Sequence, residues 1–124
     1  MVPQRTRILI IEDDADVRDA LAGALRDAGL AVEVAEDGIH GLERLRAGPV
    51  PALILLDLRM PRLCGEDFLH AMRDDDAYAH VPVITMTAGA DPTEDGEVVA
   101  HLHKPFDLED LLQIVLSVVG ASAA

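Results

Sequence analysis

The chain is poor in cysteine, in aromatic residues and in long apolar runs, and each shortage narrows what the protein can be. Cys64 is the only cysteine among the 124 residues, so no internal disulfide can form, and the chain fits a reducing compartment. Tryptophan is absent and only three residues are aromatic, so the core has to be built from aliphatic side chains and methionine. The apolar runs are too short for a secretory signal or a membrane span. We therefore expect a cytoplasmic protein with no membrane contact.

Basic residues are scarce as well. The chain has 10 Lys and Arg against 23 Asp and Glu, which gives a formal net charge of -13. A surface of this sign repels phosphate backbones and anionic lipids, so we expect no direct binding of nucleic acid. A basic surface on a partner protein would be attracted instead.

Apolar residues follow two spacings, and their alternation along the chain predicts the fold class. Short uninterrupted apolar runs are typical of strands that are covered on both faces. We expect strands at residues 8–11, 31–35, 53–57, 81–86 and 99–103. Helical spacing predicts helices over residues 15–28, 38–47, after 65 and after 107. Strands that alternate with helices predict a three-layer α/β domain around a doubly wound, five-stranded parallel sheet.

The chain reads as one domain over residues 1–124, with its core at about 6–119 and a frayed tail at 120–124. Gly29 is predicted to end the first helix and Asp107 to cap the last. The helix residues predicted to point inward are Val17, Leu21, Ala24, Leu25, Ala28, Ile39, Leu42, Leu45, Phe68, Leu69, Met72, Leu108, Leu111, Leu112, Val115 and Val119.

One crossover departs from this alternation. Residues 89–98 separate the fourth strand from the fifth, and they include two glycines, a proline and two aspartates. Glycine and proline disfavour a helix interior, so we predict a loop or one poor helical turn. The fourth helix of the expected fold is therefore shortened or missing.

Polar side chains follow the predicted strands directly, where ligands collect in open parallel sheets. Asp57 ends the most apolar strand, and a buried acid without a partner is costly. Thr87 and Lys104 follow the fourth and fifth strands, and three acids at 12–14 follow the first. Those three acids could equally cap the next helix. If the strand ends are neighbours, one site combines carboxylates, a hydroxyl and an ammonium group.

Such a site suits a hard cation and phosphoryl chemistry. Carboxylates that lie close together repel one another unless a cation sits among them, and an oxygen-rich site with room for water suits Mg²⁺. Asp57 would then stay ionised and could attack a phosphoryl donor. Lys104 and Thr87 fit the stabilisation of the charge that the acyl phosphate adds.

Four segments carry these residues: IIEDD at 10–14, DLRMPRLCG at 57–65, TMTA at 85–88 and HKPF at 103–106. In this order and on these strand ends they resemble the receiver domain of two-component response regulators, the family that includes the chemotaxis receiver. The resemblance covers nearly the whole chain. It implies a flavodoxin-like strand order 2-1-3-4-5 and a phosphorylation-dependent switch.

Carried over residue by residue, the resemblance implies that Asp57 accepts a phosphoryl group from a histidine kinase or a phosphotransfer protein. Asp13 and Asp57 would bind Mg²⁺, with Glu12 acting through water and Arg59 through its backbone carbonyl. The domain would then signal by binding a downstream protein target.

The resemblance also implies a phosphoryl-binding and switch set formed by Thr87, Ala88, Lys104 and the residue at position 101. The peptide bond before Pro105 would be cis, which the weak trans preference of X-Pro bonds allows. A receiver is not an enzyme in the usual sense, because its chemistry is limited to slow phosphorylation and dephosphorylation of itself.

Two features depart from the family. His101 stands three residues before Lys104, where the family usually has an aromatic switch residue. The short 89–98 segment would leave the fourth strand and the last helix less covered. That helix has further apolar residues, which predict either a partner or homodimer surface on strand four, strand five and the last helix, or burial against the chain's own loop. They are Ile114, Leu116 and Val118.

Two other functions are compatible with parts of the pattern. A Mg²⁺-dependent phosphohydrolase could use Asp57 as its nucleophile, but Arg59 stands where the dehalogenase-like phosphatases have a second acid. An inactive receiver that serves as a constitutive docking module is opposed by the complete set of acids, threonine and lysine. His101 and His103 could suggest a metal pair, but no third ligand lies near them in sequence, so we expect none.

Overall fold

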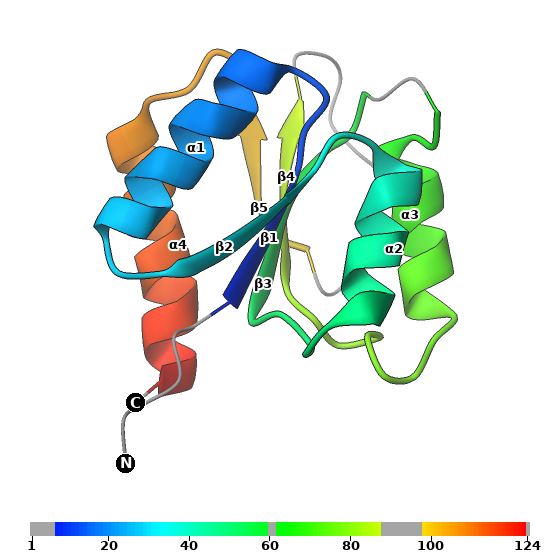
Figure 1. The fold of residues 1–124 in the computed structure, drawn as a ribbon. Helices are drawn as coiled ribbons and strands as arrows, with labels where there is room; N and C mark the ends of the chain where they lie inside the picture. The colour runs from blue at the N-terminus through cyan, green and yellow to red at the C-terminus, as the bar shows by residue number, and fades with distance from the viewer. Residues whose placement is uncertain (1–6, 60–61, 88–97, 124) are drawn as a thin grey trace.

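Five parallel strands form the middle layer of the computed structural model, which describes residues 7–59, 62–87 and 98–123 (Figure 1). The strands are β1 (Arg7–Ile11), β2 (Ala31–Ala35), β3 (Leu53–Asp57), β4 (Val83–Thr87) and β5 (Val98–His103). Their order across the sheet is β2-β1-β3-β4-β5, and every neighbouring pair is parallel. The predicted doubly wound sheet and its strand order are confirmed.

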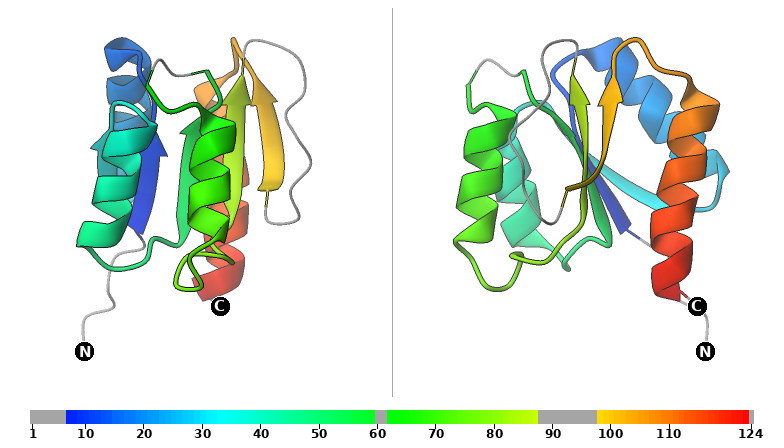
Figure 2. Two further views of the ribbon diagram at one scale, coloured as in Figure 1. Left: turned by 90° about the vertical axis from the view of Figure 1, so that its right-hand side faces the viewer. Right: turned by 180° about the vertical axis from the view of Figure 1, so that it is seen from behind.

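Helices cover both faces of the sheet. The described residues form α1 (Ala15–Asp27), α2 (Gly38–Ala47), α3 (Gly65–Arg73) and α4 (Leu108–Ala123). Helices α1 and α4 lie on one face, and α2 and α3 lie on the other (Figures 1 and 2). Four helices fit the prediction that one crossover helix is short or missing. The crossover concerned, residues 88–97, lies outside the described residues.

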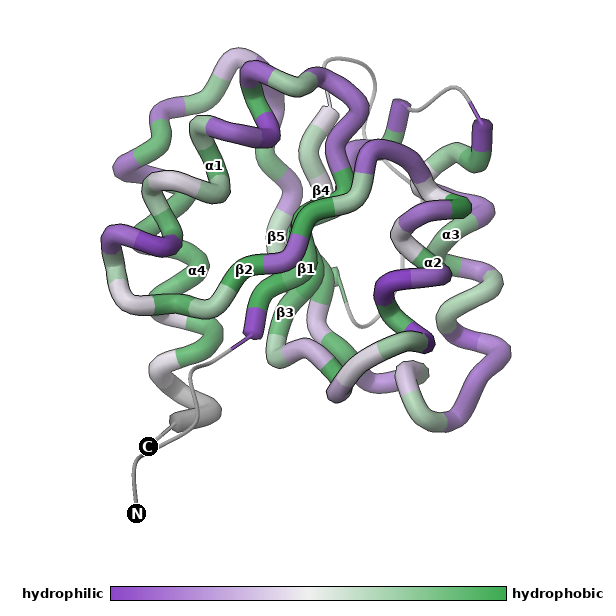
Figure 3. Tube along the Cα trace, viewed as in Figure 1, coloured by the Kyte–Doolittle hydropathy of each residue, from purple (hydrophilic) through white to green (hydrophobic). Residues whose placement is uncertain are grey.

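The core consists of two apolar clusters, one on each side of the sheet. All five residues of β3 are buried, because this central strand is covered by helices on both faces. The strands are mainly apolar along their length, whereas each helix carries polar residues as well (Figure 3). In the described part of the chain, no helix has the length and hydropathy that a bilayer crossing requires.

The helix caps show which of the acids at 12–14 caps α1, a question that the sequence left open. The carboxylate of Asp14 caps α1 by accepting the backbone N–H groups of Asp16 and Val17, at 2.9 and 3.1 Å. Gly29 follows α1 with a φ of +92°, in the left-handed region where glycine is favoured. Asp107 accepts the backbone N–H of Glu109 at 2.8 Å, as predicted for the start of α4. One acid of the 12–14 triplet is thus used as a cap, and two remain for the site.

Some strand and helix limits differ from the prediction. Strand β4 starts at Val83 instead of 81 and runs to Thr87, since Pro82 has no N–H to give to the ladder. Strand β5 starts one residue earlier, at Val98. Helix α4 continues to Ala123 through the predicted tail, because the alanines and serine around Gly120 allow a helix to continue.

Three residues predicted to face inward are exposed. Leu108 and Ile39 lie in the first turns of α4 and α2 and are 39% and 41% exposed, because these turns extend past the core. Gly41 takes the inward place on α2, against Ile11 and Phe68. Ala28 is exposed because it is already the C-cap of α1.

The predicted alternatives for the additional apolar residues of α4 were a partner surface or burial against the chain's own loop, and that loop lies outside the described residues. Ile114 and Val118 are partly buried against the core cluster on the side of α1. Leu116 is 41% exposed. Most of this apolar surface is therefore used by the chain's own core.

Two helical glycines lead to opposite predictions for Gly→Ala variants. Gly23 on α1 has open space around an added Cβ, so Gly23→Ala should stabilise the fold by about 1 kcal/mol through helix propensity. At Gly41 the Cβ would lie 2.6 Å from Cδ1 of the fully buried Ile11, so Gly41→Ala should cost about 1–3 kcal/mol by overpacking. Urea unfolding followed by far-ultraviolet circular dichroism measures both changes. Equal shifts in the two variants would contradict this description of the core.

Candidate functional site

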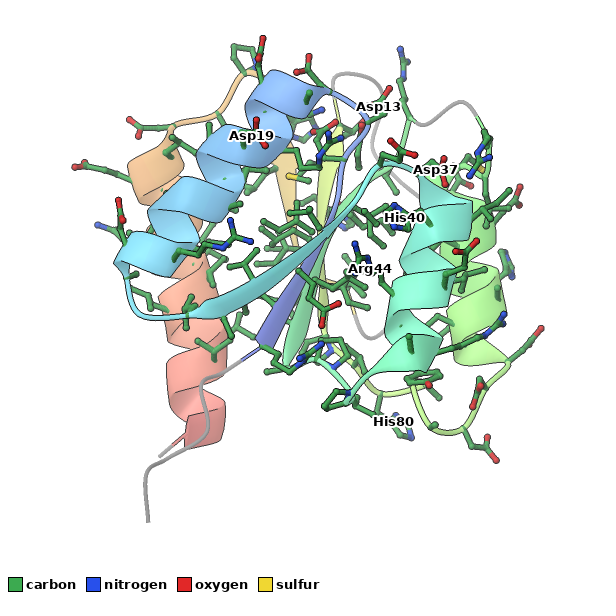
Figure 4. The ribbon with its side chains drawn as sticks, in the orientation of Figure 1. Asp13, Asp19, Asp37, His40, Arg44 and His80 are labelled. Atoms are coloured by element: carbon green, nitrogen blue, oxygen red, sulfur yellow. The ribbon has the colours of Figure 1, made fainter. Side chains whose placement is uncertain are left out.

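The predicted site residues meet at the carboxyl edge of the sheet. Strands β1, β3, β4 and β5 are parallel, so their ends lie along one edge, the upper one in Figure 1. Glu12 and Asp13 directly follow β1, and Asp57 ends β3. Asp13 is labelled at this edge in Figure 4.

Three carboxylates form a cluster at this edge. One oxygen each from Glu12, Asp13 and Asp57 lies within 4.8 Å of the others. Glu12 is 0% and Asp57 3% exposed, while Asp13 faces solvent. Two buried acids beside an accessible one make an oxygen-rich pocket that a cation can enter. Hard divalent cations prefer such ligands.

Backbone contacts fix Asp57. Strand β3 pairs with β1 on one side and β4 on the other, and the N–H of Leu58 continues this pairing to the carbonyl of Met86 at 3.1 Å. The N–H of Arg59 donates to Oδ1 of Asp57 at 3.0 Å. The carboxylate is therefore held by the strand that carries it and by the first residues of the following loop.

Lys104 is the only lysine in the chain, and it lies among these acids. Its Nζ donates to Oε1 of Glu12 at 2.6 Å and lies 3.5 Å from Oδ2 of Asp57. Its backbone N–H donates to the carbonyl of Thr87 at 2.7 Å. The peptide between Lys104 and Pro105 is cis, as the resemblance implies. The end of β5 thus places one ammonium group between two buried carboxylates.

The single ammonium group does not balance the negative charge. Burial, together with the nearby carboxylates of Glu12 and Asp13, raises the pKa of Asp57 to about 7. Burial would lower the pKa of Lys104, but the carboxylates of Glu12 and Asp57 outweigh it and raise this pKa. The site therefore holds more negative charge than its lysine can offset, which favours the binding of a cation.

The family of response regulator receiver domains matches residues 8–116 of the chain. The chain belongs to this family. Receiver domains are signalling modules of two-component systems, generally not enzymes, and they bind Mg²⁺ at an acidic pocket. The carboxylates of Glu12, Asp13 and Asp57 form an acidic pocket at the corresponding edge of this receiver domain.

Known proteins similar to this receiver domain include two transcriptional or response regulators. The DNA-binding dual master transcriptional regulator RpaA of Synechocystis is 37% identical over 86% of the chain and 46% of its own length. Response regulator MprA of Mycobacterium is 37% identical over 86% of the chain and 47% of its length. The chain spans about half the length of these curated relatives. A solved structure, the chemotaxis protein CheY4 of Vibrio cholerae, matches with a TM-score of 0.83 at 28% identity, over 93% of this chain and 99% of that one.

The remaining predicted residues of the receiver domain lie at different distances from the acids. Thr87 is buried at the end of β4, next to Lys104 through its backbone carbonyl. Arg59 lies two residues after Asp57 and is exposed, and its backbone N–H contacts Asp57. Ala88 lies outside the described residues. The structure therefore brings together the acids, Thr87 and Lys104.

His101 makes a contact that sequence reasoning missed. Its Nδ1 lies 2.5 Å from Oγ1 of the fully buried Thr85, its partner in the β4–β5 register. Thr85 and Thr87 are two residues apart, so they lie on one face of β4. This spacing was the signal in the sequence that Thr85 lies on the same side of the strand as Thr87. His101 is thus hydrogen-bonded to β4 two residues before Thr87.

A second missed contact supports Glu12. The guanidinium of Arg18 donates to the backbone carbonyl of Glu12 at 2.9 Å, which links α1 to the end of β1. The spacing of six residues gave no helical signal for this contact, because Glu12 precedes the helix.

An apolar groove adjoins the acids. Its volume is about 460 Å³, and it lies between α1 and the segment that joins β5 to α4. Lys104 belongs to both the groove and the acidic pocket. The other lining residues are Val17, Ala20, Leu21, Pro105, Phe106 and Leu108.

The raised pKa of Asp57 predicts that Asp57→Asn stabilises the metal-free protein by an amount that depends on pH. The folded-state pKa of Asp57 is about 7 against an ordinary value of 3.8, so wild-type stability falls as pH rises from about 4 to 7 and then levels off. Asparagine removes this loss. The stabilisation by Asp57→Asn should therefore be larger at pH 8 than at pH 5, by about 1–2 kcal/mol. Urea unfolding at both pH values in the presence of a chelator measures it, and an equal gain at both would contradict the shift.

Proposed function

We propose that this receiver domain accepts a phosphoryl group on Asp57 from the phosphohistidine of a histidine kinase or a phosphotransfer protein. The observation that carries the proposal is the position of Asp57. It is buried at the end of β3, beside the carboxylates of Glu12 and Asp13, with the ammonium group of Lys104 at 3.5 Å. A nucleophile, an acidic pocket and a fixed positive charge are the parts that phosphoryl transfer needs.

The acidic pocket fits Mg²⁺. The side chains of Asp13 and Asp57 would hold the ion, with Glu12 acting through water and Arg59 through its backbone carbonyl. The close approach of the three carboxylates and the raised pKa of Asp57 support this assignment. When bound, Mg²⁺ offsets the negative charge of the carboxylates and of the incoming phosphoryl group.

In the proposed step, a carboxylate oxygen of Asp57 attacks phosphorus. An O–P bond forms while the P–N bond to the donor imidazole breaks, and the leaving nitrogen keeps the electron pair and takes up a proton. Lys104 lies close enough to pair with the transferred group, and the hydroxyl of Thr87 is proposed to donate to it. Ala88 is proposed as a further contact through its place next to Thr87.

The groove beside Lys104 is the proposed binding site for the phosphodonor protein. A donor histidine has to reach Asp57 at the carboxyl edge of the sheet, and this apolar groove shares Lys104 with that site. An apolar surface of the donor that packs against Ala20 and Phe106 would bring its phosphohistidine to the same edge. Exposed apolar side chains at such a place favour association.

The output is proposed to be binding to another protein. Val99 on β5 and Leu116 on α4 are 49% and 41% exposed, and they are available to a downstream target or to a second copy. The net charge of -13 makes direct contact with nucleic acid unfavourable for this domain.

A cytoplasmic location fits the single cysteine, Cys64.

Phosphorylation can be tested by intact mass after incubation with a small phosphodonor and Mg²⁺. The wild type should gain one phosphoryl group, and the gain should disappear in Asp57→Asn or with a chelator. Asp19→Asn, on the exposed face of α1, is the matched control and should behave as wild type (Figure 4). No gain in folded wild-type protein would reject phosphoryl acceptance and favour a constitutive docking module.

If the donor protein binds in the groove, a variant there should slow phosphorylation by protein donors and not by small phosphodonors. Ala20→Glu places a charge in the apolar groove, so transfer from a histidine-phosphorylated protein that modifies the wild type should slow at least about tenfold. The rate with a small phosphodonor should stay unchanged, because Ala20 lines the groove and is not one of the clustered acids. Ala47→Glu, at the exposed end of α2, is the control. Equal slowing with both donors would contradict the assignment of the groove.

A further inference from the structure

An ion pair joins the loop after β3 to the start of α2. Nε of Arg62, in the connection between β3 and α3, donates to Oδ2 of Asp37 at 2.7 Å. Oδ1 of Asp37 accepts the backbone N–H of His40 at 2.8 Å and caps α2. The Asp37 side chain is 7% exposed. Both oxygens of a buried carboxylate are therefore occupied, and each has a different partner.

The charged form of the Asp37 side chain is stabilised by its partner Arg62. The hydrogen bond from Arg62 holds the pKa of the Asp37 carboxyl below its usual value, even though burial opposes this. Asp37 and Asp13 both lie at the carboxyl edge of the sheet (Figure 4). The ion pair thus belongs to the same edge as the acidic pocket, although neither partner is among the three clustered carboxylates.

Backbone contacts hold the same connection closely. A Cβ added to Gly38 would lie 2.5 Å from the carbonyl oxygen of Leu63, so the start of α2 packs directly on the residue after Arg62. A Cβ added to Gly65 would lie 2.7 Å from Cα of Leu58. Two glycines therefore allow the connection to sit between α2 and the end of β3.

The position of Arg62 limits the position of Arg59. Three Cα–Cα steps join them and span at most about 11 Å when extended. Arg59 donates its N–H to Oδ1 of Asp57 at 3.0 Å, and its carbonyl is the proposed backbone ligand of the cation. An anchor at Arg62 therefore restricts the loop that contacts the phosphoacceptor.

We propose that Asp37 and Arg62 are positioning residues that hold Arg59 in place for Asp57 and for the cation, without touching either. This inference rests on the proposed function for its metal and phosphoryl consequences. It assigns the two oxygens of Asp37 different tasks: Oδ1 supports α2, and Oδ2 supports the site. Only the second task should affect the acidic pocket.

Two variants remove the ion pair and keep the cap on α2. Arg62→Met removes the ion pair and leaves the cap on α2 intact. Asp37→Asn keeps a capping oxygen for His40 but places an amide donor against Arg62, so it also breaks the pair. Glu33→Gln is the matched control, because Glu33 lies in the middle of β2 and pairs with Arg7 at the start of β1, away from the carboxyl edge.

The first readout is exchange of the Arg59 amide hydrogen in metal-free protein, measured by NMR. It should become at least about tenfold faster in Arg62→Met and Asp37→Asn, because the loop loses its anchor. The double variant should exchange no faster than either single one, since all three lack the same contact. Glu33→Gln should leave the rate unchanged.

The second readout is Mg²⁺ affinity by calorimetry, with the rate of phosphorylation by a small phosphodonor. Both variants should weaken Mg²⁺ binding about tenfold and raise the Mg²⁺ concentration that gives half the maximal rate, while the maximal rate changes less. Circular dichroism confirms that each variant is folded.

The outcomes are distinguishable. Unchanged Arg59 exchange in folded Arg62→Met and Asp37→Asn would overturn the positioning role, whatever the wild type does with Mg²⁺. Unchanged Mg²⁺ affinity in variants with faster exchange would overturn its link to the cation. A wild type that neither binds Mg²⁺ nor accepts a phosphoryl group would reject the proposed function, and the exchange data would still decide whether the pair holds the loop.

Discussion

The carboxylate of Asp57 ends a strand that is buried along its whole length, and the surroundings of this charge organise the carboxyl edge of the sheet. A buried carboxylate needs partners, and here the available partners are one backbone N–H, one ammonium group and two further acids. Burial, together with these acids, raises the pKa of Asp57 to about 7. A site with this imbalance is suited to a cation and then to a phosphoryl group, which is the basis of the proposed switch.

The three consecutive acids after β1 have three different environments. Asp14 caps α1, Glu12 is fully buried and bonded to Lys104, and Asp13 faces solvent beside Asp57. The chain turns from strand to helix within these residues, so adjacent side chains point in different directions. A short run of like charges can therefore supply a cap, an ion pair and an accessible ligand at the same time.

Loop placement at this edge depends on contacts between elements. Gly38 and Gly65 let the backbone between β3 and α3 pack against α2 and the end of β3, and the pair of Asp37 and Arg62 holds the same segment. On the other side of the site, His101 is bonded to Thr85 across two strands. A phenylalanine at this position would have no polar atom for that hydrogen bond, so signal transfer here is expected to depend on different packing.

The order of strands and helices, and the identity of the acids, Thr87 and Lys104, could be read from the sequence, because apolar spacing and strand-end residues are local properties. The family motifs added the cis peptide before Pro105. Which of the acids caps α1, the exposure of Leu108 and Ile39, and the partners of His101 and Arg62 were decided by tertiary structure. The contacts of His101 and Arg62 join residues 16 and 25 positions apart in the chain, and only the packing of elements on the sheet brings them within hydrogen-bond distance. The capping acid and the exposed side chains depend on where each helix starts relative to the sheet.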